Sequence, residues 1–153
     1  MKAVIQRVKS AKCVVEGKIT GACREGLLIL LGVGTEDSEE DAELLARKIA
    51  KLRIFCDEND KMNLSCEDIG GELLIISNFT LYADYSHGNR PNYLNAQAPE
   101  RANELYEYFC SVMSKTIPHI GKGIFGAHME ITSELNGPVT IVMESQVLKK
   151  KKG

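Results

Sequence analysis

Residues 73–84 read LLIISNFTLYAD, an apolar run that becomes polar abruptly at Ser77. Four consecutive apolar residues predict a strand that is buried on both faces. A buried strand that ends in hydroxyl and amide side chains places main-chain N–H groups at the rim of a sheet, where a small substrate can be held against rigid backbone. Such hydroxyls can also do no more than satisfy nearby backbone groups. The stretch by itself leaves both interpretations open.

Further strands are expected on both sides of this run. A second apolar run, at residues 27–31, predicts a central strand covered on two sides. Residues 1–8 predict a strand, and residues 11–20 predict a hairpin that turns at Glu16 and Gly17. We also expect strands at 53–56, 129–135 and 139–144, the last two joined by a tight turn at Asn136, Gly137 and Pro138.

Two segments carry the signals of helices. Ser38 is placed to cap a helix with an acidic first turn, and Pro99 is placed in the first turn of another. In both segments apolar residues recur at spacings of three and four, which predicts one buried face per helix. These residues are Ala42, Leu45, Ile49 and Leu52 in the first helix, and Ala102, Leu105, Phe109 and Val112 in the second. The loop between strand and second helix, at 85–98, has no periodicity, and loops of this length are often functional.

The order of these elements predicts the architecture. We expect a single α+β domain at residues 1–148, in which two helices cover a mostly antiparallel sheet or a partly closed β-barrel. The Lys-rich residues 149–153 are expected to form a disordered tail.

Composition narrows the function classes. The chain has 153 residues, a net charge of −2 and 44% hydrophobic residues, so it is not built as a whole to coat nucleic acid. RNA contacts would need a local patch, either on the first helix (Arg47, Lys48, Lys51 and Arg53) or in the tail at 149–152, although a solvated helix face explains the first equally well. No apolar run approaches the roughly 20 residues of a membrane span. Five cysteines without a C-x-x-C pair predict reduced thiols in a cytoplasmic protein.

The common catalytic patterns do not occur in this sequence. His87, His119 and His128 have no metal-ligand spacing, so neither a metal nor another cofactor is expected. There is no P-loop and no G-x-S-x-G elbow. Ser77 or Thr80 could act as a nucleophile only beside a base, and none is apparent, although a triad assembled in space stays open.

Residues 136–140, NGPVT, add a second candidate. Asn and Gly accept a positive φ and Pro fixes a corner, so a simple turn explains them. A bond between a residue and a following proline can also be cis. A cis bond between Gly137 and Pro138 would expose bare carbonyls with no Cβ in the way, which is a rigid backbone probe for a substrate's α-carbon.

Taken together, SNFTL at 77–81 and NGPVT at 136–140 resemble the two signature motifs of the D-aminoacyl-tRNA deacylases. The resemblance covers nearly the whole chain. It includes AVIQRV at 3–8, the segment 28–37 with its Gly-Val-Gly, GNRP at 88–91 and FGA at 125–127.

The resemblance implies an enzyme that hydrolyses the ester of D-aminoacyl-tRNA, and of mischarged glycyl-tRNA, and that works as a homodimer. Gly137 and Pro138, joined by a cis bond in the family and braced by Arg7, would enter the partner's pocket. There their carbonyls would collide with an L side chain and spare a D side chain.

The resemblance also implies how the reaction proceeds. Main-chain N–H groups of Phe79 and Thr80 would polarise the ester carbonyl, flanked by Ser77 and Asn78. The 2′-hydroxyl of the terminal adenosine would assist the attack of water, so no side-chain base is needed. From the resemblance, Phe125 and Met129 are expected to line the pocket. Whether Thr80 is a nucleophile or a support stays open.

Two departures from the family pattern affect these expectations. Asn78 stands where the family usually has glutamine, and Asn92 and Tyr93 replace a common Ser-Phe in a loop that also lacks the usual lysine near His87. These changes bear on the RNA contacts of the loop. Two alternatives remain, a non-enzymatic nucleic-acid-binding protein on the same scaffold and a general esterase using Thr80 or Ser77.

Overall fold

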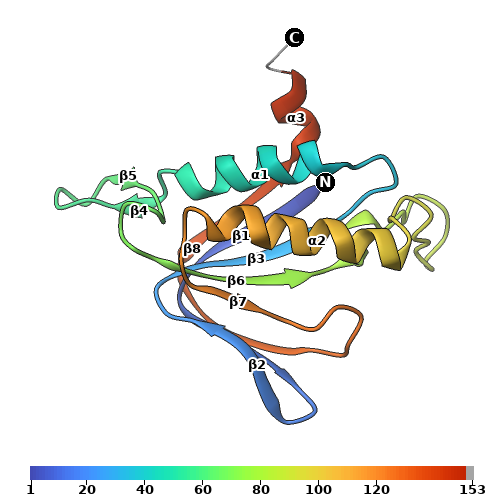
Figure 1. Cartoon of the computed structure of the whole chain (residues 1–153), viewed down its shortest axis with the longest axis horizontal. Helices are drawn as coiled ribbons and strands as arrows, with labels where there is room; N and C mark the ends of the chain where they lie inside the picture. The colour runs from blue at the N-terminus through green and yellow to red at the C-terminus, as the bar shows by residue number, and fades with distance from the viewer. Residues whose placement is uncertain (151–153) are drawn as a thin grey trace.

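Two buried strands form the centre of the molecule. β3 (Gly26–Gly32) and β6 (Glu72–Ser77) pair in parallel, from Gly26 opposite Glu72 to Leu31 opposite Ser77. The computed structural model, which describes residues 1–150, places them inside a six-stranded sheet of order β2-β1-β3-β6-β7, with β8 paired to β1 (Figure 1). The two strands predicted from continuous apolar runs are therefore confirmed.

These strands are apolar on both faces because they separate two cores. Leu27, Ile29 and Leu31 pack in the core under the helices, whereas Leu28 packs in a second core on the other side of the sheet. Each fully buried Leu or Ile contributes roughly 1.5–3 kcal/mol relative to an exposed one. A strand with alternating apolar and polar residues would place polar side chains in one of the two cores.

The longest strands run along one side of the sheet. β1 (Lys2–Val15) pairs antiparallel with β3, with β2 (Lys18–Cys23) and with β8 (Glu130–Glu144). β2 then bends toward β7 (Ile120–Lys122), where the Thr20 hydroxyl donates to the Lys122 carbonyl at 3.2 Å. This contact nearly closes the sheet, which confirms the expected partly closed barrel. β3–β6 and β6–β7 are parallel and the other pairings antiparallel.

The expected turn at Asn136, Gly137 and Pro138 is wrong. The structure has one strand, β8, in place of the predicted pair at 129–135 and 139–144. Both halves of β8 pair with the same strand β1, from Val14 opposite Glu130 to Lys2 opposite Glu144. The three residues form a bulge in this pairing, which shifts register beside Val8. The chain therefore continues in one direction through a sequence that is typical of a turn.

Both predicted helices are confirmed, and a third follows β8. α1 (Glu39–Lys51) begins after Ser38, whose backbone N–H donates to the Asp41 carboxylate at 2.9 Å, and α2 (Pro99–Ser114) has Pro99 in its first turn. The two helices cover one face of the sheet (Figure 1). α3 (Ser145–Lys150) extends into the segment where the disordered tail was expected to begin, and the rest of that tail lies outside the described residues.

The remaining elements are short. β4 (Phe55–Cys56) and β5 (Met62–Leu64) form a small separate hairpin, and a 3-10 helix, η1 (Phe79–Tyr82), follows β6. In residues 1–150, no helix is long and apolar enough to cross a membrane.

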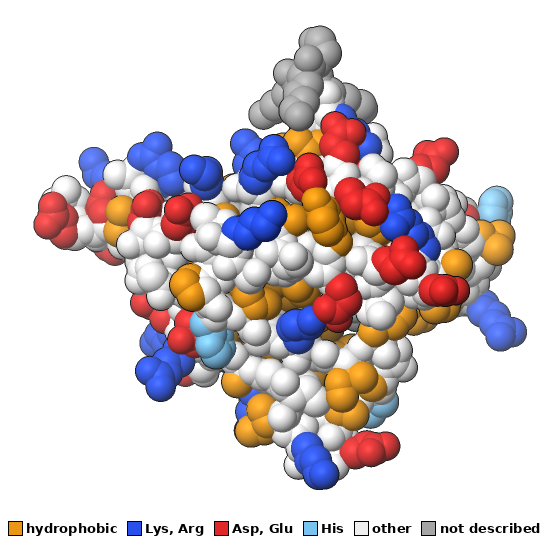
Figure 2. Space-filling view, in the orientation of Figure 1, with side chains coloured by type: hydrophobic (Ala, Val, Ile, Leu, Met, Phe, Trp, Pro, Cys, Tyr) orange, Lys and Arg blue, Asp and Glu red, His pale blue; other side chains and the backbone are white. Residues whose placement is uncertain are grey.

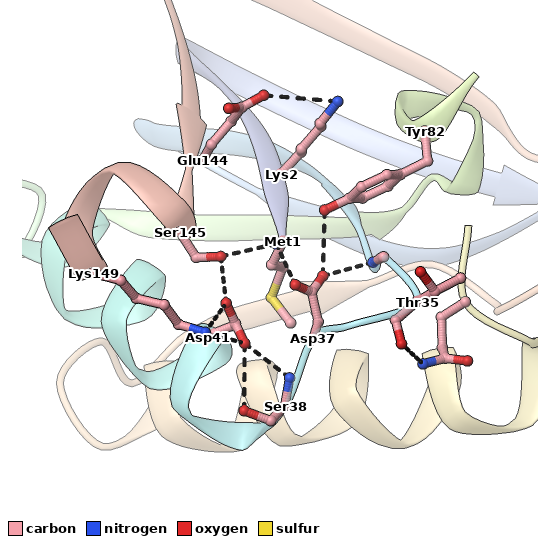
Figure 3. Close-up of polar contacts among 12 residues, drawn as sticks. Met1, Lys2, Thr35, Asp37, Ser38, Asp41, Tyr82, Glu144, Ser145 and Lys149 are labelled. Atoms are coloured by element: carbon pink, nitrogen blue, oxygen red, sulfur yellow. Dashed lines mark hydrogen bonds and ion pairs between the residues drawn. The ribbon is translucent and has the colours of Figure 1, made fainter. Parts of the chain in front are cut away.

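A buried polar network joins the start of β1 to α1 and α3 (Figure 3). The ammonium group of Met1 donates to Asp37 at 2.7 Å and to the Ser145 hydroxyl at 2.9 Å. Ser145 in turn donates to Asp41 at 2.6 Å, and Lys149 lies 3.0 Å from the same carboxylate. Burial alone would raise the pKa of Asp41, but the hydrogen bonds from Ser145, from Ser38 and from Lys149 lower it below its usual range.

Replacing Asp41 with Asn is expected to destabilise the protein by about 2–4 kcal/mol at pH 7. The reason is that the hydrogen-bond donors of the network, Ser145 and Lys149, lose the carboxylate that accepts from them. The lowered pKa of Asp41 contributes stability above its unfolded-state value near 4, and this is lost as pH falls through the folded-state value. The free energy of unfolding, measured with urea, should therefore fall less between pH 7 and pH 3 in Asp41→Asn than in the native chain. The exposed Glu40→Gln is the matched control, expected within about 0.5 kcal/mol of the native chain. Equal stability of Asp41→Asn and the control would contradict the role of the network.

Candidate active site at the end of β6

The end of β6 opens into a cavity of about 370 Å³. Its walls come from η1, from the loop before α2 with the start of α2, and from the segment after β7. The lining residues are Val33, Ser77, Phe79, Tyr93, Ala96, Gln97, Ala98, Pro99, Ala102, Phe125 and Gly126. A larger cavity of about 440 Å³ between Lys12 and Thr132 has no aromatic wall. The cavity at β6 is apolar with a few polar groups, as small-molecule sites usually are.

The strand and α2 hold this end of the sheet rigid. The buried hydroxyl of Tyr106, on α2, donates to the Ile75 carbonyl of β6 at 2.7 Å. Burial raises the pKa of Tyr106, so its phenol stays a neutral donor near pH 7. Gly32 at the end of β3 lets η1 approach closely, because a Cβ there would lie 2.9 Å from the Leu81 Cβ and 3.0 Å from the Asn78 carbonyl oxygen.

The first turn of η1 presents main-chain donors. The N–H of Leu81 donates to the Asn78 carbonyl at 3.4 Å, which is the first bond that a 3-10 turn makes back to its start. The N–H groups of Phe79 and Thr80 precede that bond and have no partner within the turn. Phe79 also lines the cavity. This arrangement can hold an anionic oxygen.

Two aromatic rings form one wall of the cavity. Phe79 is 55% exposed, and its ring meets that of Tyr93 edge-on, with centroids 5.0 Å apart. Sequence reasoning missed Tyr93 as a cavity residue and connected its departure from the family pattern with RNA contacts. The only available signal was its place in the aperiodic loop at 85–98. The departure therefore changes the cavity wall, by adding a hydroxyl to an aromatic position.

Thr80 and Asn78 interact with each other beside the cavity. The Thr80 hydroxyl donates to the Asn78 Oδ1 at 2.5 Å, and neither residue is in the cavity lining. An amide oxygen cannot accept the hydroxyl proton as a general base does. The lining also contains no histidine. A nucleophilic Thr80 has no activating partner in this arrangement.

Gly137 and Pro138 lie outside the cavity lining of their own chain. Their peptide bond is cis, both residues are exposed, and Gly137 has a φ of +147°, which an L side chain rarely adopts. Arg7, which is 9% exposed, donates to the Asn136 carbonyl at 2.9 Å and to the Ile54 carbonyl at 2.7 Å. Arg7 therefore joins the residue before Gly137 to the segment after α1.

The structure thus brings together only part of the predicted site. Ser77, Phe79 and Phe125 line one cavity, whereas Gly137, Pro138 and Arg7 lie elsewhere. Met129 packs against the second core, with its sulfur 2.5 Å from where a Cβ on Gly123 would be, and is not in the cavity lining. In residues 1–150, no three His, Cys, Asp or Glu side chains gather to hold a metal ion.

Comparison with known proteins places the chain in a family. The family model described as D-Tyr-tRNA(Tyr) deacylase matches residues 4–144. The chain belongs to this family. Among curated relatives, the D-aminoacyl-tRNA deacylase of Thermosipho africanus is 52% identical, covering 95% of this chain and 98% of its own length. That of Koribacter versatilis is 51% identical with the same coverage, and that of Deinococcus radiodurans 50%, covering 94% and 99%.

Solved structures agree with the deacylase family fold. The c-Myc DNA Unwinding Element Binding Protein has a TM-score of 0.89 and 39% identity, covering 94% of this chain and 98% of its own. A probable eukaryotic D-amino acid tRNA deacylase has a TM-score of 0.84 at 14% identity with the same coverage, which supports the fold alone. The predicted family membership and α+β fold are therefore confirmed.

Proposed function

We propose that this protein hydrolyses the ester bond of D-aminoacyl-tRNA, and of mischarged glycyl-tRNA, and releases the free amino acid and the tRNA. The observation that carries the proposal is the apolar cavity at η1, in a chain that is about half identical to curated deacylases over nearly its whole length. One domain at residues 1–148 would contain the activity, and it would act in the cytoplasm, where its five free thiols stay reduced.

The chemistry would depend on main-chain donors. The N–H groups of Phe79 and Thr80 would bind the oxyanion that forms when water attacks the ester carbonyl. The 2′-hydroxyl of the terminal adenosine would assist that water, which explains why the cavity lining needs no histidine or carboxylate. The Thr80 hydroxyl, already bonded to Asn78, would support the turn.

The site would be completed by a second copy of the chain. β8 pairs with β1 along one edge, and its exposed residues include the apolar Ile131, Leu135 and Val142, which are 39%, 45% and 70% exposed. Such a long edge strand favours association. In a two-fold dimer, each bulge with Gly137 and Pro138 would enter the partner's cavity and exclude L side chains by steric collision.

The alternative function is nucleic-acid binding without catalysis, although the family model and the curated relatives are all named for deacylation. The relative with a TM-score of 0.89 is named for binding a DNA element. A non-enzymatic nucleic-acid-binding protein on this scaffold would bind tRNA without turnover.

Release of free D-tyrosine from D-Tyr-tRNA tests the proposal. We expect multiple turnovers by the native chain. Ala98→Trp is the matched control, because Ala98 is exposed and lines the cavity, so a large side chain there should block substrate without disturbing the core. If the native chain binds tRNA but releases D-tyrosine no faster than buffer or Ala98→Trp, the deacylase proposal is wrong and the second function is favoured.

A further inference from the structure

A groove of about 310 Å³ lies between α1 and α3, away from the candidate active site. Its lining consists of Leu44, Arg47, Lys48, Lys51 and Leu148, and we call it the basic groove. Lys51 lies three residues after Lys48 and four after Arg47, so all three cations lie on one side of α1. The two leucines form an apolar floor, one from each helix. No carboxylate is in this lining.

The charges of the basic groove are available to a ligand. Arg47 makes an exposed ion pair with Glu43 at 3.4 Å, which is worth little in water. In the described part of the chain, no carboxylate lies within 4.0 Å of Lys48 or Lys51. By contrast, Lys149 is already paired with Asp41, and Arg53 is held at the Asn63 carbonyl at 3.0 Å.

The two ends of α1 differ in surface charge. Figure 2 shows Lys and Arg side chains over the C-terminal half of α1, and Asp and Glu side chains over the other end of the helix, whereas the adjoining hairpin carries both. Cations in a last helical turn complement the helix dipole. That effect does not explain why three cations line one groove with a leucine from each of two helices.

The basic groove is connected to the Gly137–Pro138 bulge. Lys51 ends α1, and Ile54 follows after about 10 Å of extended chain. Arg7 binds the Ile54 and Asn136 carbonyls at the same time, at 2.7 and 2.9 Å. Phe55 and Asn136 also line one common cavity. The segment that follows α1 is therefore linked to the bulge through Arg7.

We infer that the basic groove binds the phosphate backbone of the tRNA whose aminoacyl end occupies the partner's cavity. The inference rests on the proposed function, because the bulge must face the partner's cavity. If it does, Arg7 links the end of α1 to the bulge that faces the partner, and the tRNA leaving the partner's cavity would run along this groove. A polyanion is the partner that three unpaired or weakly paired cations recognise.

Arg47→Gln/Lys48→Gln/Lys51→Gln tests the groove. At about 0.15 M salt, the KM for D-Tyr-tRNA should rise about tenfold or more with kcat unchanged, and the salt slope of log(kcat/KM) should fall by about 2. Hydrolysis of D-tyrosyl-adenosine, which has no phosphate, should change less than about twofold. Lys12→Gln/Lys18→Gln/Arg24→Gln is the matched control, since it removes two Lys and one Arg that are equally exposed on the β1–β2 hairpin region.

Mixed dimers test the assignment to the partner. Two mixed dimers are compared. In each of them one protomer carries Ala98→Trp, so only the other protomer has an open cavity. Neutralising the groove of the open-cavity protomer should leave KM for D-Tyr-tRNA unchanged. Neutralising the groove of the blocked protomer should raise it.

The outcomes separate the inference from the proposed function. If the groove variant has the same KM as the control variant, the groove is not an RNA site. If KM in the mixed dimers rises only when the groove of the open-cavity protomer is neutralised, the groove does not act on the partner's cavity. If the native chain does not hydrolyse D-Tyr-tRNA, the proposed function fails. Fluorescence anisotropy with uncharged tRNA then still decides the groove, since equal affinity of the groove and control variants overturns it.

Discussion

Replacing Phe79 with Pro is expected to lower kcat for D-Tyr-tRNA by about 10²–10³-fold while the chain still folds. Proline removes the N–H that would hold the oxyanion. It is tolerated at the first position of a helical turn, where that N–H has no backbone partner. Asn78, which precedes it, lies in the β region, with φ −144° and ψ 90°, and not in the α conformation that a following proline disfavours. The measurement is single-turnover hydrolysis, together with a thermal unfolding curve for each variant.

Two controls separate the main chain from the side chains. Phe79→Ala keeps the N–H and loses only the ring that packs on Tyr93, so we expect a smaller loss of kcat. Thr80→Ala keeps the N–H of residue 80 and loses the hydroxyl bonded to Asn78, so a substantial rate should remain. A folded Phe79→Pro with native kcat would contradict the main-chain oxyanion site. A dead Thr80→Ala with a trapped covalent adduct on the native chain would favour the esterase alternative.

Replacing Arg7 with Ala is expected to cost about 2–4 kcal/mol of stability and to reduce the D-over-L preference at least about tenfold. The buried guanidinium makes two charge-assisted hydrogen bonds, and their loss leaves the Asn136 and Ile54 carbonyls without that donor. The bulge that would discriminate between enantiomers is then no longer fixed. Urea unfolding gives the stability, and hydrolysis of D- and L-Tyr-tRNA under native conditions gives the preference.

Arg7→Lys is the matched variant for this position. It keeps the charge but not the planar fork that reaches both carbonyls, so an intermediate loss of both quantities is expected. If Arg7→Ala retains the native ratio of D to L hydrolysis, the bulge does not act as the chiral filter, whatever the change in stability.

The sequence predicted the elements whose patterns have one physical cause. The runs at 27–31 and 73–76 were identifiable as strands because a sheet between two cores needs apolar residues on both faces. α1 was identifiable from its cap at Ser38 and its stripe through Leu45 and Ile49. Such local signals do not depend on distant parts of the chain.

Other features depend on pairing that the sequence does not show. Asn136, Gly137 and Pro138 have the composition of a turn, but both flanks pair with β1, so the strand continues. Tyr93 belongs to an aperiodic loop, and only folding shows that its ring meets Phe79. The motif resemblance joined residues 77–81 and 136–140, yet Gly137 and Pro138 lie outside the cavity lining of their own chain. Our proposal that a second copy brings them to the cavity is not a prediction that one chain's pattern could give.

The central claim is that peptide groups from two copies of the chain discriminate between D and L esters. The most direct test is the ratio of kcat/KM for D-Tyr-tRNA to that for L-Tyr-tRNA. The mass of the protein in solution should be determined in the same buffer. We expect a dimer and a preference for the D ester above about 100-fold. Equal rates on the two esters, or the same preference in a protein that is monomeric at the assay concentration, would contradict this claim.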